Sequence, residues 1–183
     1  MRAYGSWKQA EIAGGAVTPA NEMPSKGRRL RDFGLISALG ALIHLSDYRG
    51  RANLVLIADD GRTETKELLT NVANQYTQVK NEQAEVLALV RTSRERAAEK
   101  ARQLKIPYPV LADEDGTVHQ QWGAVDSQGQ DAAAVYVTDR FGEVFGAFRT
   151  RDGQPLPGVA DLLNWLEFIN SQCPECESPE WPA

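Results

Sequence analysis

The chain has 183 residues, a length that suits one domain with its own hydrophobic core. Hydrophobic residues make up 42% of the chain and charged residues 25%, which is ordinary for a soluble globular protein. The formal net charge of −5 disfavours nucleic acid and anionic membrane surfaces as partners.

Targeting and membrane segments are not expected from the sequence. Residues 1–17 contain no continuous apolar core after Arg2, so they do not resemble a secretory signal peptide. The longest apolar patch, residues 35–45, is interrupted by Gly40 and His44 and is too short to span a bilayer. Two cysteines do not make a disulfide scaffold. We therefore predict a cytoplasmic protein with no membrane partner.

Composition divides the chain into three parts. Residues 1–27 lack strong periodicity and are predicted to form an irregular arm. Residues 28–171 carry the periodic apolar patterns of a compact domain. Residues 172–183 form an acidic, proline-rich tail that contains the sequence Cys-Pro-Glu-Cys.

Strands and helices alternate within the predicted domain. Short apolar runs indicate buried strands, and apolar residues at helical spacing indicate amphipathic helices. Thr92 and Glu95 have the spacing of a capping box, which predicts the start of a helix. In chain order, the predicted elements are a strand at 54–58, a helix at 66–82, a strand at 85–90, a helix at 93–104, a short extended segment at 109–112, a hairpin of strands at 134–138 and 143–149, and a closing helix at 158–172.

This order predicts the fold class. A strand–helix–strand unit implies parallel strands joined by a right-handed crossover. The late hairpin adds an antiparallel edge. The expected architecture is therefore an α/β domain with a mixed central sheet and helices on both faces.

Four segments, in order, resemble the thioredoxin-like peroxiredoxins, the alkyl hydroperoxide reductase and thiol-specific antioxidant family. The resemblance extends over most of the predicted domain and implies a thioredoxin-like fold. The segments are HLSDYRGRANLVLI (44–57), EVLALVRTSRERAAEKARQL (85–104), PYPVLADEDGTVHQQWGA (107–124) and VYVTDRFGEV (135–144).

The resemblance also predicts where the family's catalytic groups would fall. Its peroxidatic cysteine lies three residues before a Glu-Leu pair, in the first turn of the helix that follows the first core strand. With that pair matched to Glu67 and Leu68, the cysteine position falls on Glu64 and the family's threonine position falls on Gly61. The family's cis-proline would fall near Ala133, and its supporting arginine would fall on the residue before. The chain therefore departs from the family at each reacting position.

The chemistry explains why this departure matters. Peroxide reduction needs a thiolate that attacks the O–O bond, and a carboxylate cannot pass through a sulfenic acid. Thr63 is the expected N-cap of the helix, and the positive helix end stabilises an anionic Glu64. We favour Glu64 as a helix-start residue, with an anion or acid site left over from catalysis as the alternative.

The only two thiols, Cys173 and Cys176, allow three interpretations. They could form a redox dithiol in which Cys173 attacks and Cys176 resolves. They could supply half of a zinc site, which would require two tails paired in a dimer because a structural site needs four ligands. They could also belong to a tail without such a role. The neighbouring glutamates and the preceding helix end disfavour a reactive thiolate.

Other polar groups give weaker signals. Asp59, Asp60 and Glu64 crowd one loop and could bind a divalent cation, although such a run is more often a solvated turn. Asp113 to Gly116 has the composition of a turn.

The functional hypothesis is a non-catalytic binding or scaffolding protein of a redox family, without a cofactor. Its partner would be a protein bound through the former active-site face or a sheet edge. This partner could be a second copy of the chain, which would make a homodimer. One alternative is an enzyme, a thiol-dependent oxidoreductase or peroxidase that uses Cys173 and Cys176. The second alternative is the zinc site described above.

Overall fold

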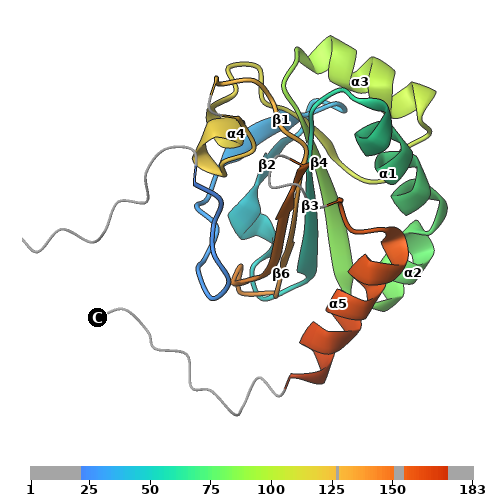
Figure 1. The fold of residues 1–183 in the computed structure, drawn as a ribbon. Helices are drawn as coiled ribbons and strands as arrows, with labels where there is room; N and C mark the ends of the chain where they lie inside the picture. Colours follow the sequence, from blue (N-terminus) through green and yellow to red (C-terminus); the bar gives the residue numbers. More distant parts are fainter. Residues whose placement is uncertain (1–21, 127, 151–154, 173–183) are drawn as a thin grey trace, which may run out of the picture.

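The computed structural model describes residues 22–126, 128–150 and 155–172, which form a seven-stranded sheet flanked by helices (Figure 1). The strands are β1 Gly34–Ser37, β2 Leu42–His44, β3 Asn53–Asp59, β4 Ala84–Val90, β5 Val110–Ala112, β6 Ala134–Thr138 and β7 Val144–Arg149. The helices are the 3-10 helix η1 Leu45–Tyr48 and the α-helices α1 Thr63–Asn74, α2 Tyr76–Asn81, α3 Arg94–Gln103, α4 Thr117–Gln121 and α5 Val159–Ser171.

The sheet is mixed, as the sequence predicts. Its strand order is β2-β1-β5-β4-β3-β6-β7. The central strands β3, β4 and β5 run parallel, because helical connections return the chain to the same end of the sheet each time. The pairs β1–β2, β1–β5, β3–β6 and β6–β7 are antiparallel. The predicted fold class is confirmed.

Alternating side chains along the strands build two hydrophobic layers. In β3, Val55 and Ile57 face a cluster that includes residues of α1, α2, α3 and α5. Leu54 and Leu56 face the opposite cluster, which contains Trp122 at the end of α4. Figure 1 shows the same division, with α4 on the other side of the sheet from α1, α2, α3 and α5. A strand that is buried on both faces has an unbroken run of apolar residues in its sequence. This run is why β3 was predictable.

The β1–β2 hairpin was not predicted. The segment reads as an apolar patch, but Gly40 at φ +89° closes a turn in which the backbone N–H of Ser37 donates to the carbonyl of Ala41 at 2.8 Å. β1 then pairs with β5, with Ile36 opposite Ala112. This pairing depends on a distant part of the chain, so local sequence gave no sign of it.

The predicted helix over 66–82 is divided in two. Gln75 has φ −113° and ψ 16°, which ends α1 and begins α2. After the break, the Tyr76 hydroxyl donates a 2.5 Å hydrogen bond to Glu85, and the Tyr76 ring lies 5.6 Å from that of Tyr108. These contacts with β4 and with the start of β5 favour the break over a continuous helix.

The predicted capping box at Thr92 and Glu95 is wrong. The N-cap of α3 is Ser93, and its side chain makes no capping hydrogen bond. Instead, the Glu114 carboxylate, from the loop after β5, accepts the backbone N–H of Arg94 at 3.1 Å. A carboxylate from a neighbouring loop thus satisfies an amide at the helix start that the local motif was expected to satisfy.

The remaining predicted elements agree with the structure. The strands at 85–90 and 109–112 correspond to β4 and β5, the hairpin to β6 and β7, and the closing helix to α5. Within the described residues, no helix is both long enough and apolar enough to cross a membrane. The predicted arm over 1–27 and tail over 172–183 lie mostly outside the described residues, so these boundaries stay predictions.

Candidate functional site

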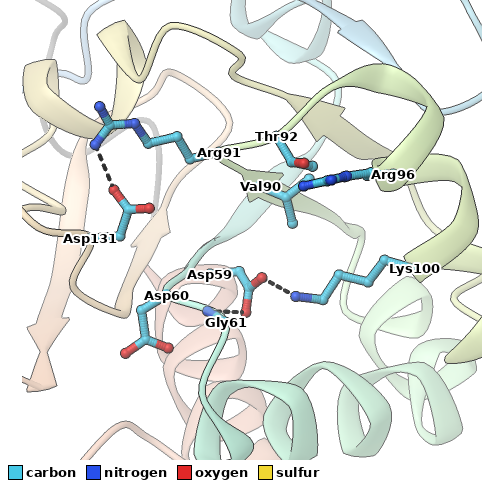
Figure 2. Close-up of a pocket in the computed structure, with 9 residues that line it drawn as sticks. All are labelled: Asp59, Asp60, Gly61, Val90, Arg91, Thr92, Arg96, Lys100 and Asp131. Atoms are coloured by element: carbon cyan, nitrogen blue, oxygen red, sulfur yellow. Dashed lines mark hydrogen bonds and ion pairs between the residues drawn. The ribbon is translucent and has the colours of Figure 1, made fainter.

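A charged pocket lies at the carboxyl ends of β3 and β4, where the loops leading to α1 and α3 leave the sheet (Figure 2). Its volume is about 290 Å³. Carboxyl ends of parallel strands are a common location for ligand sites in open α/β sheets. The lining residues are Asp59, Asp60, Gly61, Val90, Arg91, Thr92, Arg96, Lys100 and Asp131.

Asp59 is the last residue of β3 and is nearly buried, with 6% of its surface exposed. Its carboxylate forms an ion pair with the Lys100 ammonium group of α3 and accepts the backbone N–H of Gly61 at 3.2 Å. Figure 2 shows Lys100 reaching from its helix to the strand end. A buried carboxylate with these two partners fixes α3 against the end of β3.

Asp60 organises the loop that starts α1. Its Oδ1 accepts the backbone N–H of Arg62 at 3.0 Å and the hydroxyl of Thr65 at 2.7 Å. The Arg62 side chain approaches Oδ2 at 3.5 Å. Gly61 has φ +79°, a left-handed conformation that residues with a Cβ adopt at a cost, so the loop geometry favours glycine here.

Arg91 closes the opposite wall. Its Nη1 donates to Asp131 at 2.9 Å and approaches the carbonyl of Gly129 at 3.4 Å. The hydrogen bond and charge of Asp131 raise the pKa of Arg91, which reinforces its positive charge. Arg91 also lies against Gly116, where an added methyl group would come within 2.4 Å of its Nε.

The residues predicted at the former catalytic positions do not form one cluster. Gly61 lines the pocket, and Glu64 is exposed in the first turn of α1. The prediction of Thr63 as N-cap is wrong: Arg62 is the N-cap and Thr63 the first helical residue, because Asp60 already holds the Arg62 amide. Ala133 is buried, and its carbonyl accepts the backbone N–H of Thr150 at 3.1 Å.

The crowded carboxylates are engaged separately. Asp59 pairs with Lys100, Asp60 holds the start of α1, and Glu64 points to solvent. Across residues 22–126, 128–150 and 155–172, no three histidine, cysteine, aspartate or glutamate side chains are grouped to hold a metal ion. Cys173 and Cys176 lie outside these ranges, so their predicted redox and zinc roles stay predictions.

Sequence reasoning missed the three pocket cations Arg91, Arg96 and Lys100. Two signals were available: Arg96 and Lys100 are four residues apart, which places them on one face of a helix, and Arg91 directly follows a buried strand. Neither signal identifies the carboxylates that these cations meet.

A second pair of buried polar side chains was also missed. Asp113 and His119 are both fully buried, and His119 Nδ1 lies 2.6 Å from Asp113 Oδ2. Asp113 also accepts the backbone N–H groups of Val118 and His119. Burial acts to raise the pKa of Asp113, but the hydrogen bonds from His119 and Val118 outweigh it and hold that pKa below its ordinary value of 3.8. The sequence predicted a turn followed by a short helix here, which agrees with α4, but it did not identify the pair.

The strand order and the helices match the fold of the thioredoxin-fold peroxiredoxins. A sequence model of the AhpC/TSA family matches residues 26–146, and the chain belongs to that family.

Solved peroxiredoxin structures share this fold. Peroxidoxin BcpB from Mycobacterium tuberculosis has a TM-score of 0.71 and 19% identity, over 82% of this chain and 100% of that one. AhpC from Mycobacterium tuberculosis has a TM-score of 0.71 and 16% identity, over 85% and 99%. A yeast mitochondrial 1-Cys peroxiredoxin has a TM-score of 0.70 and 15% identity, over 81% and 77%. Such identities support the fold alone. No curated protein sequence matches the chain.

Proposed function

We propose that this member of the AhpC/TSA family is a non-catalytic binding protein that has lost the peroxidatic cysteine. The observation that carries the proposal is the chemistry of the segment Asp59–Lys66, which joins β3 to the first turn of α1 and contains no cysteine. The position assigned to the peroxidatic cysteine holds Glu64, which is exposed and cannot form a sulfenic acid.

The surroundings of this position support the same proposal. A reactive thiol at a helix start needs nearby positive charge that remains available to stabilise the thiolate. Here Lys100 is paired with Asp59 and Arg62 with Asp60, so the two cations that contact the carboxylates of the loop are already compensated. The strand end is arranged to hold charges in place, which suits binding better than thiol chemistry.

The β1–β2 hairpin is the surface that suits a protein partner. Leu39 at its tip is 97% exposed, and Ile36 and Leu42 are exposed beside it. β2 ends the strand order, so no described strand pairs with its outer edge. Exposed sheet edges with apolar side chains bind extended chains of other proteins or of a second copy.

A substitution at the tip of the β1–β2 hairpin distinguishes a second copy of the chain from a different protein as the partner. In sedimentation velocity, the parent chain at increasing concentration is compared with Leu39→Asp. Association that weakens in the variant would identify a second copy as the occupant. A parent that stays monomeric would direct the search to a different protein.

A thiol–disulfide activity of the tail is the competing function. Cys173 and Cys176 are the only thiols of the chain, and their Cys-x-x-Cys spacing allows a small disulfide. A zinc site shared by two tails is the remaining alternative, and metal analysis would support it by finding one zinc ion per two chains.

Hydrogen peroxide consumption with dithiothreitol as reductant tests the main proposal. The assay compares the parent chain with a Cys173→Ser, Cys176→Ser double variant and with a protein-free blank. We expect neither protein to exceed the blank. Turnover that is lost in the double variant would overturn the proposal and assign a peroxidase reaction to the tail. Turnover that survives in the double variant would also overturn it, since the chain has no other thiol.

A further inference from the structure

Among the described residues, three aspartates and three cations line the pocket, but the ion pairs leave one of these cations without a partner. Three carboxylates line it, and each has its own cation: Asp59 has Lys100, Asp131 has Arg91, and Asp60 has Arg62 from the adjoining loop. The fourth cation, Arg96, is left over. Because the carboxylates are already paired, they oppose an incoming anion much less than free carboxylates would.

Arg96 is exposed to solvent and lines the pocket. It lies on α3 one turn before Lys100, so both side chains lie on the helix face that meets the pocket. Figure 2 shows Arg96 extending from α3 toward Val90 and Thr92. Within the described part of the chain, no hydrogen bond or ion pair joins either the Arg96 guanidinium group or the Thr92 hydroxyl to another group.

We propose that the pocket binds a small molecule through one anionic oxygen group, a carboxylate or a phosphate, which is held by the guanidinium group of Arg96 and the hydroxyl of Thr92. A guanidinium group presents a planar pair of N–H donors that matches such groups in a bidentate way. A hydroxyl beside it can donate to the same oxygen or to its neighbour.

The pocket limits the size and character of the ligand. Its volume of about 290 Å³ is at the lower end of the range for small-molecule sites, so the ligand is a small metabolite. Val90 lies between the charged walls and is almost completely buried. The ion pairs Asp59–Lys100 and Arg91–Asp131 hold those walls in place before the ligand arrives, which reduces the ordering cost of binding.

This inference rests on the proposed binding function and names a ligand class for the strand-end pocket, a site that shares no residue with the β1–β2 hairpin. Its test is separate from the peroxide assay, because Arg96 carries no thiol chemistry. Peroxide turnover would refute the non-catalytic role, whereas the titration described next refutes the anion site alone.

An NMR titration at constant ionic strength tests the site. Sodium acetate and sodium phosphate are the two probes, each exchanged against sodium chloride, and the signals followed are the backbone amides of residues 59–62 and 90–92 and the Nε–H of Arg96. We expect saturable shifts at these positions with at least one probe. The probe that binds more tightly identifies the carboxylate or the phosphate as the favoured group.

Two single substitutions on α3 provide a matched comparison. Arg96→Gln removes the unpaired guanidinium group and is expected to weaken binding roughly tenfold or more, the usual effect of losing charge-assisted hydrogen bonds. Arg102→Gln makes the same change in charge on the same helix, but Arg102 lies outside the pocket and donates to the carbonyl of Ala98. We expect Arg102→Gln to bind like the parent.

Thr92→Val supplies a second probe of the site. It keeps the shape of the side chain and removes the hydroxyl, so we expect a smaller loss than for Arg96→Gln. Shifts that do not saturate, or equal affinities in the parent and Arg96→Gln, would overturn the inference. Equal weakening by Arg96→Gln and Arg102→Gln would also overturn it, because it would show attraction by overall charge alone.

Discussion

Two aspartates at neighbouring strand ends have opposite surroundings. Asp59 ends β3 and pairs with Lys100 at the wall of a pocket. Asp113 follows β5 and pairs with His119, with neither side chain exposed to solvent. Both carboxylates come from the same edge of the parallel strands, yet Asp59 lines the pocket and Asp113 is enclosed in the core.

The surroundings of the two aspartates show how a carboxylate that stabilises the fold can be distinguished from one at a binding site. The carboxylate of Asp113 accepts hydrogen bonds from two backbone amides and contacts the His119 ring. These interactions hold the start of α4 inside the protein. His119 Nε2 has no hydrogen-bond partner among the described residues, which leaves Asp113 as the polar anchor of that ring. The Asp59–Lys100 pair instead lies beside the unpaired donors of Arg96 and Thr92.

The largest expected effect is the loss of stability on substitution of Asp113. Asp113→Ala leaves the His119 ring and two backbone amides without a partner inside the core, and each buried group left without a partner costs about 1–3 kcal/mol of unfolding free energy. Urea unfolding measures it. Asp115→Ala is the control, because exposed Asp115 only accepts the Thr117 amide, and its loss costs about 1 kcal/mol. Equal losses in both variants would contradict the structural role of Asp113.

The pH dependence of stability sharpens the same contrast. The pKa of Asp113 is lowered in the folded state, so its ionised form contributes stability above the unfolded pKa of about 3.9 and loses it as pH falls through the lower folded pKa. We expect the stability advantage of the parent over Asp113→Asn to shrink as the pH falls below about 4. A carbon-detected NMR titration of the carboxyl group that placed its midpoint above 3.8 would contradict this.

An intermediate effect is expected at the pocket wall. Lys100→Met leaves the carboxylate of Asp59 nearly buried with only the Gly61 amide as a partner, and the loss of a charge-assisted hydrogen bond costs about 1–3 kcal/mol. Lys66→Met on α1 is the control, because its side chain is exposed, and a change below about 0.5 kcal/mol is expected there. A double-mutant cycle with Asp59→Asn would detect the pair as non-additivity, and additive losses would argue against it.

The smallest effect on stability is expected for the partly exposed ion pair between Arg91 and Asp131 of the pocket. Arg91 and Asp131 are each partly exposed, and such ion pairs contribute about 0–1 kcal/mol to the free energy of unfolding. Arg91→Gln should therefore shift the urea midpoint only slightly, although Arg91 also lies against Gly116 at the start of α4. Arg51→Gln, an exposed position before β3, gives the baseline. A loss above about 2 kcal/mol would contradict the assignment of this ion pair to the exposed class.

Local patterns predicted most of the architecture. The apolar runs of β3 and β4 and the apolar stripe of α5 each follow from spacing alone, because burial on two faces or on one helical face leaves a periodic trace. The hairpin of β6 and β7 was predictable from the turn before Gly142, which adopts φ +83°. The capping of α3 was not predictable, since Glu114 reaches Arg94 from another loop.

The candidate site was predictable only in part. The segment Asp59–Gly61 was recognised because it follows a buried strand and precedes a helix. The cations were not, because their role depends on which carboxylate each one meets. Whether the tail thiols react or bind zinc stays a prediction, since Cys173 and Cys176 lie outside the described residues.

The sequence by itself determined the periodic elements, the mixed sheet and the absence of a cysteine in the β3–α1 segment. Only the tertiary structure decided which charges are paired and which are free. Lys100 reaches Asp59 across 41 positions of sequence, and it does so because β3 and β4 pair in parallel with Asp59 beside Val90. Contacts within a helix or strand repeat at short spacings that a sequence displays, whereas contacts between strand ends depend on sheet register, which only the folded chain fixes.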